Sequence, residues 1–377
     1  MKYRHLLFLF PFCLTPLLAQ PHHGHGHNHQ AERAIHFPDT EQYLTLVADL
    51  HMHTVFSDGS VWPDIRVNEA VRDSLDAISL TEHLEYQPHA DDLPHPNRNR
   101  AHDIASELAR PHDLMVLRGA EITRSMPPGH SNAVFIQDAN KLLIDDPVAA
   151  FEEANRQGAF TFWNHPNWIA QREDGVARLT DMHRELIRRK LLHGIEVVND
   201  LTISKEAFQI ALDNNLTVMG TSDIHGLVDW QFELHKGGHR PVTLVLATER
   251  TPEAMKAALM AGRTIAWFEN TLVGREENVR AIVEASVKIT AANYYGATSV
   301  AEVTIQNGSD AAYVLENLSG YSLQSDLGPI TLSPNGSTTI HVMTLEQVDK
   351  LSMKFRVLNA MVAPEKALEL TLTMKVE

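Results

Sequence analysis

The sequence predicts an α/β protein in which a parallel sheet, closed into a TIM-like barrel, is followed by a β-rich C-terminal domain. Two observations predict this fold class. Short apolar runs alternate with amphipathic segments over residues 43–274, and repeated strand-then-helix units form parallel sheets and barrels. After about residue 275 the pattern changes to short alternating runs, which are typical of antiparallel sheets and sandwiches.

Nine runs in the first region are strand candidates, and several are apolar on both faces, as a buried parallel strand requires. They are residues 43–50, 76–83, 114–123, 131–138, 159–166, 194–199, 216–223, 241–248 and 264–268. Amphipathic segments at 67–76, 148–158, 204–215 and 251–263 predict helices between them. The last of these has Thr251 as N-cap, Pro252 at the first helical position and Gly262 at its end.

The C-terminal region has strand candidates at 285–295, 299–308, 313–324, 337–345 and 368–376. Asn307-Gly308 and Pro334-Asn335-Gly336 separate some of them, and both favour hairpin turns. We therefore expect residues 275–377 to form an independent, β-sandwich-like domain packed beside the barrel. Its one histidine, His341, indicates that the chemistry lies elsewhere.

Residues 1–20 have the layout of a signal peptide: a basic start, an apolar run and a small residue at Ala19. The apolar run is too short to span a bilayer and is interrupted by Pro11 and Pro16. We therefore expect a periplasmic or secreted protein that does not contact the membrane once the signal is removed. Residues 21–42 form a leader that begins PHHGHGHNHQ, a composition that favours disorder over a dedicated role in metal capture.

Composition limits the ligands and partners of the mature chain. The 48 acidic residues outnumber the 32 Lys and Arg, so we expect an acidic surface that repels nucleic acid. Cys13 is the one cysteine and lies in the signal peptide. A bound metal must then use nitrogen and oxygen ligands, and the 22 histidines are the natural source of nitrogen.

Histidines and carboxylates stand where the strand candidates end. His51 and His53 close the first run in ADLHMHT, and one intervening residue points both side chains to the same face of an extended chain. Asp58 follows in FSDGS, where Gly59 permits a turn back over the strand end. The other candidates end later runs or follow them closely: His83, Glu121, His130, His165, Asp223 and His225.

In a parallel barrel the carboxyl ends of the strands meet on the face that carries the active site. Six segments thus deliver nine candidate ligands to one place. A single His-x-His pair would mean little among 22 histidines, and any one of these residues alone could equally be a core or surface side chain. Their shared placement predicts a metal site.

The order of the motifs HMH, SDG, TEH, AEI, GH, NHP and SDIH resembles the PHP family, named for polymerase and histidinol-phosphatase domains. The resemblance covers about residues 44–270 and all nine ligand positions. It implies a distorted (β/α)7 TIM-like barrel of the PHP type over residues 43–274, with a trinuclear metal site. With its signal peptide and β-rich tail, the chain most resembles the exported Sb-PDE type phosphodiesterases, which act on organophosphate diesters.

The resemblance also implies the roles of the ligands. They are His51, His53, Glu121 and Asp223 for one ion, Glu121, His130 and His165 for a second, and Asp58, His83 and His225 for a third. A hydroxide bridging two of the ions, expected to be Mn, Zn or Fe, would attack the phosphorus, with Glu121, Asp223 and His225 as catalytic residues. No side-chain nucleophile is then needed.

Other polar residues near the strand ends are candidates for supporting roles. Asp49, Asn164 and Glu196 lie on the same strands and are placed to orient ligands. Arg124, Lys236 and His239 follow ligand-bearing strands and are candidates for holding the phosphate of a small-molecule ester.

Two alternatives to a phosphodiesterase remain open. The same metals could cleave a phosphate monoester if more cations surrounded the dianion. A different class, an exported metal-binding or metal-storage protein, would make the His-rich leader the main feature. Deletion of residues 21–30 distinguishes the second alternative, because a storage protein would then lose most of its metal.

Overall fold

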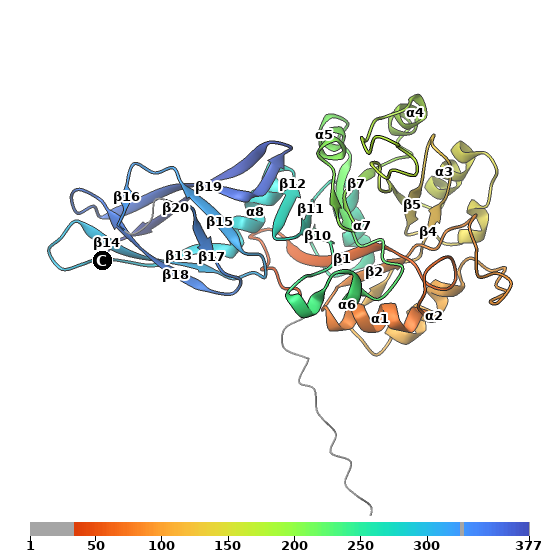
Figure 1. Ribbon diagram of the computed structural model, residues 1–377, viewed down its shortest axis with the longest axis horizontal. Helices are drawn as coiled ribbons and strands as arrows, with labels where there is room; N and C mark the ends of the chain where they lie inside the picture. Colours follow the sequence, from red (N-terminus) through yellow and green to blue (C-terminus); the bar gives the residue numbers. More distant parts are fainter. Residues whose placement is uncertain (1–33, 325–327, 377) are drawn as a thin grey trace, which may run out of the picture. The chain divides into compact units, whose positions relative to one another are not determined.

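The structure, a computed structural model, describes residues 34–324 and 328–376 (Figure 1). The predicted signal peptide and the first five histidines of the leader, His22 to His29, lie outside the described residues. Residues 34–42, the end of the predicted leader, pack on the folded chain, with Ile35 and Phe37 buried. Among the described residues, we find no helix whose length and apolar character would let it cross a bilayer.

Seven strands form a ring. They are β1 (Leu44–Met52), β2 (Ala77–Leu80), β4 (Gly119–Ile122), β5 (Ser131–Val134), β6 (Phe160–Trp163), β7 (Gly194–Asn199) and β9 (Thr217–Thr221). β1 pairs with β2 in one sheet, and β4, β5, β6, β7 and β9 follow one another in a second. Single bridges, Met52 to Ile224 and His83 to Glu121, connect the two sheets. Since β5 runs antiparallel to both of its neighbours, the barrel is distorted, as the fold class expected from the sequence requires.

Helices follow most of the barrel strands, and Figure 1 shows α1 and α2 side by side. They are α1 (Pro63–Arg72), α2 (Arg100–Ala109), α3 (Pro147–Arg156), α4 (Asp181–Arg188), α5 (Lys205–Asp213) and α7 (Pro252–Met260). The predicted cap of α7 is confirmed, because the Thr251 side chain accepts a hydrogen bond from the backbone N–H of Ala254. α1 begins earlier than predicted, since Trp62 at its N-cap supplies no capping side chain as a sequence signal.

Strand direction is where the sequence prediction is wrong. β10 (Val242–Ala247) and β11 (Thr264–Phe268), expected to be parallel, run antiparallel to β1 and to β10, respectively. β12 (Thr271–Gly274), which was not predicted, continues this antiparallel series. A strand buried on both faces has the same apolar pattern in either direction, so the pattern could not decide between them.

The C-terminal strands form a sandwich preceded by helix α8 (Glu276–Ser286), which the sequence analysis missed. One sheet holds β13 (Val287–Tyr294), β14 (Val300–Asn307), β18 (Ser337–Met343) and β16 (Ser322–Leu323). The facing strands are β15 (Tyr313–Asn317), β17 (Ile330–Leu332), β19 (Lys350–Ala363) and β20 (Lys366–Lys375). The two predicted hairpin turns instead carry the chain between these sheets, because β14 does not pair with β15, nor β17 with β18.

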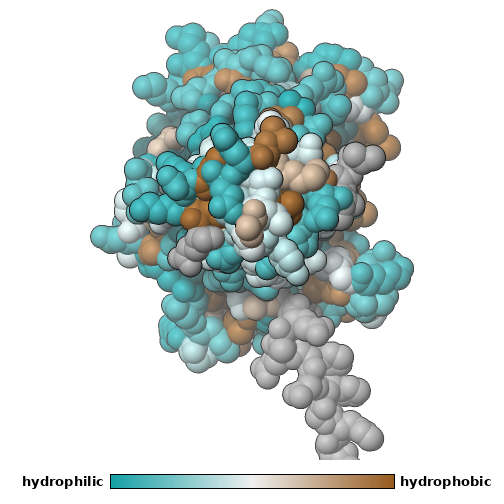
Figure 2. Space-filling view, turned by 90° about the vertical axis from the view of Figure 1, so that its left-hand side faces the viewer, coloured by the Kyte–Doolittle hydropathy of each residue, from teal (hydrophilic) through white to brown (hydrophobic). Residues whose placement is uncertain are grey.

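The sandwich is not independent of the barrel, in contrast to the expectation from sequence. β19 pairs in parallel with β12, so one ten-stranded sheet runs from β17 through β12 to β1, β2 and β3 (Met115–Val116). The remaining short elements are β8 (Thr202–Ile203), α6 (Val228–Gln231) and the 3-10 turns η1 (Ala139–Leu142) and η2 (Leu234–Lys236). Seen from the end that carries β14 and β16, the surface is mostly hydrophilic (Figure 2).

Candidate metal centre

The nine predicted ligands lie together at one end of the barrel. His51 is the second-last residue of β1, and Glu121 lies in β4. His130 directly precedes β5, and because that strand is antiparallel, its first residue lies at the end of the barrel where its parallel neighbours finish. The other ligands follow β1, β2, β6 and β9: His53, Asp58, His83, His165, Asp223 and His225.

Local backbone geometry brings these side chains inward. The loop after β1 turns back tightly enough that a Cβ at Gly59 would lie 2.7 Å from the backbone nitrogen of Thr54, so only glycine fits there. His165 and Asp223 have positive φ angles of 27° and 49°. Such conformations are unfavourable for non-glycine residues and persist where the surroundings enforce them, which is common at functional sites.

The first group of ligand atoms consists of His51, His53 and Asp223. The Nε2 atoms of the two histidines are 3.1 Å apart and lie 3.1 and 3.2 Å from Oδ1 of Asp223. Both imidazole rings are fully buried. Nδ1 of His51 lies 2.7 Å from Oε1 of Glu196 and donates its proton to that carboxylate. In the neutral ring, Nε2 of His51 then carries no proton, and its lone pair faces the carboxylate of Asp223.

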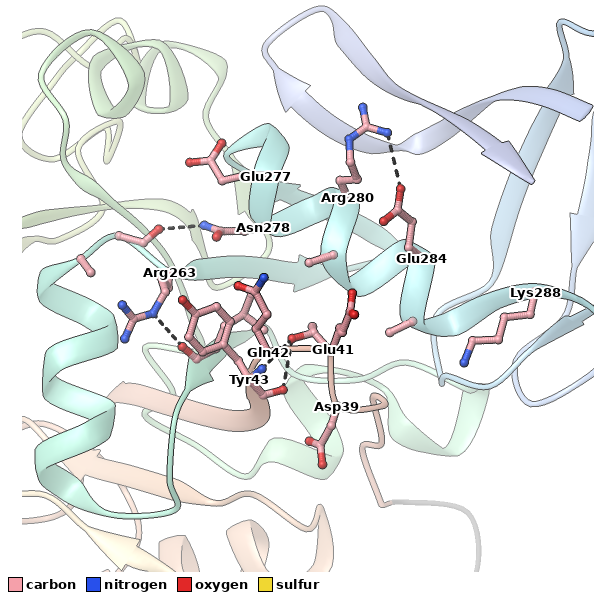
Figure 3. Close-up of a pocket in the computed structure, with 16 residues that line it drawn as sticks. Asp39, Glu41, Gln42, Tyr43, Arg263, Glu277, Asn278, Arg280, Glu284 and Lys288 are labelled. Atoms are coloured by element: carbon pink, nitrogen blue, oxygen red, sulfur yellow. Dashed lines mark hydrogen bonds and ion pairs between the residues drawn. The ribbon is translucent and has the colours of Figure 1, made fainter. Parts of the chain in front are cut away.

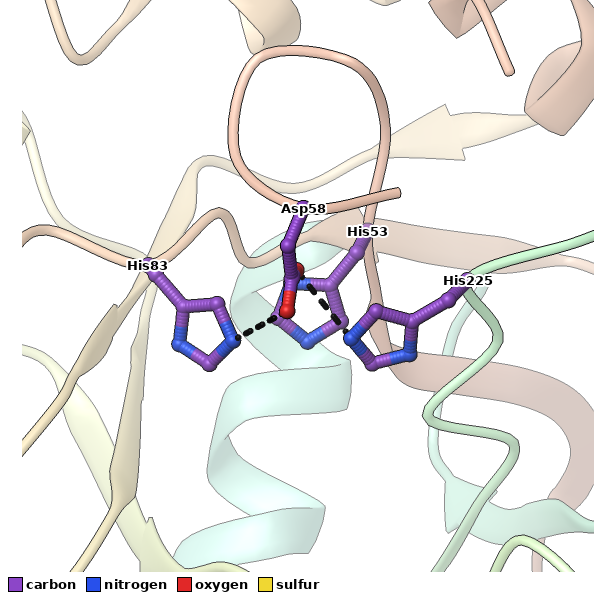
Figure 4. Close-up of side chains that lie close together, drawn as sticks. All are labelled: His53, Asp58, His83 and His225. Carbon is purple, nitrogen blue, oxygen red and sulfur yellow. Dashed lines mark ion pairs between the residues drawn. The ribbon is translucent and has the colours of Figure 1, made fainter. Parts of the chain in front are cut away.

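The second group surrounds Asp58 and includes His53, His83 and His225 (Figure 4). The carboxylate of Asp58 lies 3.4 Å from Nε2 of His83 and 3.1 Å from Nε2 of His225. The ring of His53 stacks on both histidines, with centroid distances of 4.5 and 4.3 Å. His225 is the most exposed of the four, at 38% of its side chain, so this group is open to solvent on the His225 side.

Glu121 contacts histidines of all three groups. Its carboxylate lies 2.8 Å from Nδ1 of both His83 and His130, which together form the third group. It also approaches Nε2 of His165 at 3.7 Å. The resemblance assigned His83 to a different ion from Glu121, whereas the structure places the two side chains in direct contact.

Burial disfavours charge throughout the cluster, but the neighbouring groups decide the outcome. Against burial, Asp223 and Glu196 raise the pKa of His51 well above its ordinary value, and Glu121 and Asp58 raise the pKa of His83 to about 10. Burial and the nearby His225 and His83 lower the pKa of His53 to about 3. The carboxylates therefore attract positive charge, whether from protons or from metal ions.

The residues present fit divalent metal ions. Four buried polar atoms of the cluster form no hydrogen bond, although three of them lie 2.8 to 3.1 Å from a ligand atom of another cluster residue: Asp58 Oδ1, Glu121 Oε2, His130 Nδ1 and His165 Nδ1. Buried polar atoms are rarely left in this state without a partner or an ion. Imidazole nitrogens and carboxylate oxygens are the ligands that Mn, Fe and Zn accept.

Two of the three supporting residues named from sequence contact ligands directly. Glu196 binds Nδ1 of His51 and accepts a hydrogen bond from the backbone N–H of His165 at 2.6 Å. Asn164 donates to Oε1 of Glu121 at 3.0 Å. Asp49 supports the backbone next to Asp223: it accepts a hydrogen bond from the backbone N–H of Ser222 and pairs with buried Arg240.

Sequence reasoning missed a second layer of support under His53. Buried Glu82 accepts hydrogen bonds from Thr54 and from Ser57, whose hydroxyl lies 3.2 Å from Nδ1 of His53. Buried Arg66 donates to the carbonyls of His53 and Ile224 at 2.9 and 3.1 Å and so joins the ends of β1 and β9. Glu82 could have been found from its position next to His83 in the sequence, whereas no local sequence pattern points to Arg66.

The three candidate phosphate-binding residues do not present free charge to the cluster. Arg124 pairs with Glu85 at 2.8 Å, and Lys236 pairs with Glu233 at 2.5 Å on the surface. His239 stacks face to face on Trp267 with a centroid distance of 3.6 Å, and burial lowers its pKa. The partners of Arg124 and His239 come from other parts of the fold, whereas Lys236 pairs within its own turn.

A separate cavity of about 700 Å³ lies away from the nine ligands (Figure 3). It is lined by residues 39–43, which precede β1, by Arg263 and by α8 residues such as Arg280 and Glu284. The guanidinium of Arg263 lies over the ring of Tyr43, and Arg280 pairs with acidic residues of its own helix. Both arginines that line this cavity are thus already in contact with neighbouring side chains.

Comparison with solved structures shows an extensive similarity. The chain is 40% identical to a two-domain protein from Bacteroides vulgatus that contains a predicted PHP-like metal-dependent phosphoesterase, with a TM-score of 0.85. The match covers 92% of this chain and 99% of that chain. A family model described as an Ig-like domain matches residues 287–373, in the sandwich. No curated protein matches.

Two further solved structures match more weakly. One is a putative metal-dependent phosphoesterase from Bifidobacterium adolescentis, 17% identical, with a TM-score of 0.37, covering 48% of this chain and 88% of that chain. The other is an amidohydrolase from Chromobacterium violaceum, 14% identical, with a TM-score of 0.34, covering 48% and 87%. At these TM-scores neither similarity supports a conclusion about the fold or the site.

Proposed function

This chain belongs to the PHP-like metal-dependent phosphoesterases, and from that premise we propose that it hydrolyses phosphate diesters of small organic alcohols outside the cytoplasm. The main support for the proposal is the convergence of nine side chains with nitrogen or oxygen ligand atoms, among which Glu121 contacts several of the other eight. Their three overlapping groups fit about three divalent ions, with Mn, Zn or Fe as the expected metals.

Divalent ions, when bound, acidify a water molecule to a nucleophile near neutral pH and polarise the phosphoryl oxygens. The protein positions the ligands for this chemistry. Glu196 fixes the tautomer of His51, Asn164 orients the central carboxylate of Glu121, and Arg66 holds together the two strand ends that carry His53 and His225. The exposed side of His225 is where a substrate reaches the site.

Charge around the site favours a diester over a monoester. A monoester carries nearly two negative charges near neutral pH, because its second pKa is about 6, and its recognition calls for additional cations. Arg124 and Lys236 are already neutralised by Glu85 and Glu233. A diester with one negative charge needs no such cations beyond the metals.

Metal analysis combined with a rate screen tests the proposal. With matched mono-, di- and triesters of 4-nitrophenol, we expect about three ions per chain and the highest kcat/KM for the diester. A higher kcat/KM for the monoester would favour the phosphomonoesterase alternative. Loss of most of the metal on deletion of residues 21–30, without hydrolysis of any ester, would favour metal storage.

A further inference from the structure

Two exposed aromatic side chains contact ligands of the metal centre. The ring of Tyr86, 52% exposed, meets His83 edge-on with a centroid distance of 5.9 Å. The ring of Trp168, 44% exposed, lies 5.6 Å from the ring of His130 and 5.1 Å from that of His165. The two residues come from different loops, after β2 and after β6. Their apolar rings therefore lie beside the imidazole rings of His83, His130 and His165.

Both loops are fixed by hydrogen bonds near the aromatic residue. The backbone N–H of Trp168 donates to the carbonyl of His165 at 2.9 Å, and the Trp168 carbonyl accepts from Gln171 and Arg172 at 3.0 and 2.8 Å. Next to Tyr86, the carboxylate of Glu85 accepts a hydrogen bond from the backbone N–H of Thr123. The rings are thus presented at the site by ordered turns. A single exposed aromatic side chain needs no explanation, but two that contact the ligands of one centre indicate a binding surface.

The charge beside these rings identifies what they bind. Next to Tyr86, Glu85 already pairs with Arg124, so an additional anionic group of a substrate would gain little binding energy from this arginine. An apolar ring, by contrast, would gain stacking or edge-on contact with Tyr86 and Trp168. We propose that Tyr86 and Trp168 bind the apolar, aromatic ester group of the substrate and determine the specificity of the reaction. The inference rests on the proposed phosphodiesterase function and adds the class of alcohol to it.

Two diesters with the same 4-nitrophenyl leaving group and either a methyl or a phenyl group as the second ester test this inference. For the wild-type protein we expect kcat/KM to be at least tenfold higher for the phenyl diester. Trp168→Ala and Tyr86→Ala should each reduce this preference several-fold, and the double variant should abolish it. Tyr295→Ala is the matched control, because Tyr295 is 70% exposed in a turn of the C-terminal sandwich.

The ratio of the two rates separates the inference from the proposed function. Loss of metal or partial unfolding lowers both rates together and leaves the ratio unchanged. If neither diester is hydrolysed by the metal-loaded protein, the phosphodiesterase function itself fails. If the methyl diester is hydrolysed but the wild-type ratio is near one, or the ratio survives in the double variant, the aromatic specificity is overturned and the phosphodiesterase function stands.

Discussion

Glu121 uses both carboxylate oxygens at the centre of the cluster. Oε1 faces His130 and His165, and Oε2 lies 2.8 Å from His83, 3.6 Å from His51 and 3.5 Å from His53. Despite burial, the surrounding histidines hold the pKa of Glu121 well below its usual range. A fully ionised carboxylate in this position can offset the charge of more than one bound cation.

Replacing Glu121 tests this role. Glu121→Gln keeps the shape of the side chain but removes the negative charge, so metal ions should bind less tightly. We expect kcat/KM for a 4-nitrophenyl diester to fall at least about 10²-fold, roughly 3 kcal/mol of transition-state stabilisation. Turnover with metal in excess, together with the metal content of the purified variant, measures the effect.

His25→Ala in the leader is the control for Glu121→Gln, and its rate should remain nearly unchanged. The opposite result, in which Glu121→Gln kept its rate and the leader variant lost it, would mean that the barrel is not the catalytic centre.

The positions of the candidate ligands at strand ends could be predicted from sequence, whereas many of the contacts around them could not. His51, His83 and Asp223 stand at strand ends, a position that apolar periodicity makes visible. The charge partner of Arg124 is Glu85 from another loop, and the aromatic contacts of Trp168 depend on how the turn after β6 folds. Such pairings arise from tertiary structure and leave no local pattern.

At the scale of elements, helix α4 supports the loop that carries His130. His183 in its first turn accepts a hydrogen bond at Nδ1 from the backbone N–H of Thr180, and its Nε2–H donates to the carbonyl of Pro128 at 2.6 Å. Its ring stacks on Trp163 with a centroid distance of 3.9 Å. A neutral imidazole satisfies these contacts, whereas a proton on Nδ1 would face the backbone N–H of Thr180 and end that hydrogen bond.

This geometry predicts a loss of stability in acid. Burial, together with Arg172 and Arg184, lowers the pKa of His183 to about 4, whereas an unfolded histidine has a pKa of about 6.5. Between these values the unfolded chain binds a proton that the folded chain does not, so acid favours unfolding. Stability should fall by about 3 kcal/mol through this residue between pH 7 and pH 4, which denaturant unfolding at several pH values measures.

His183→Gln isolates this contribution from the other histidines. Glutamine at this position can keep the capping hydrogen bond but does not titrate. The variant should therefore lose about 3 kcal/mol less than the wild type over the same pH range. Parallel pH profiles for the two proteins would refute the assignment.

The strands show which features of an element its sequence determines. All nine predicted runs in residues 43–274 contain strands, but the run 114–123, predicted as one strand, holds two, β3 and β4, which belong to different sheets. The direction of β10 and β11 was wrong, because an apolar run reveals burial but not which neighbour it pairs with. Helix α8 was missed where its mixed polar sequence joins the barrel to the sandwich.

At the scale of the whole molecule, the barrel and the sandwich share structure. β12 of the barrel region pairs with β19 through Leu272 and Ala360, and through Val273 and Met361. One hydrophobic core cluster includes residues from Ile35 to Leu372. A continuous sheet and a common core are expected to make the two parts unfold together rather than one after the other.

Phe355→Ala tests this coupling. Phe355 is fully buried in β19, and its truncation should cost about 3–5 kcal/mol. All five tryptophans lie between residues 62 and 267, so their fluorescence reports on the barrel alone. If the two parts unfold together, the tryptophan transition should shift down by at least about 5 °C and coincide with that seen by circular dichroism, whereas Tyr295→Ala should leave both unchanged. A tryptophan transition that stays in place while circular dichroism shows an earlier one would establish that the sandwich unfolds independently.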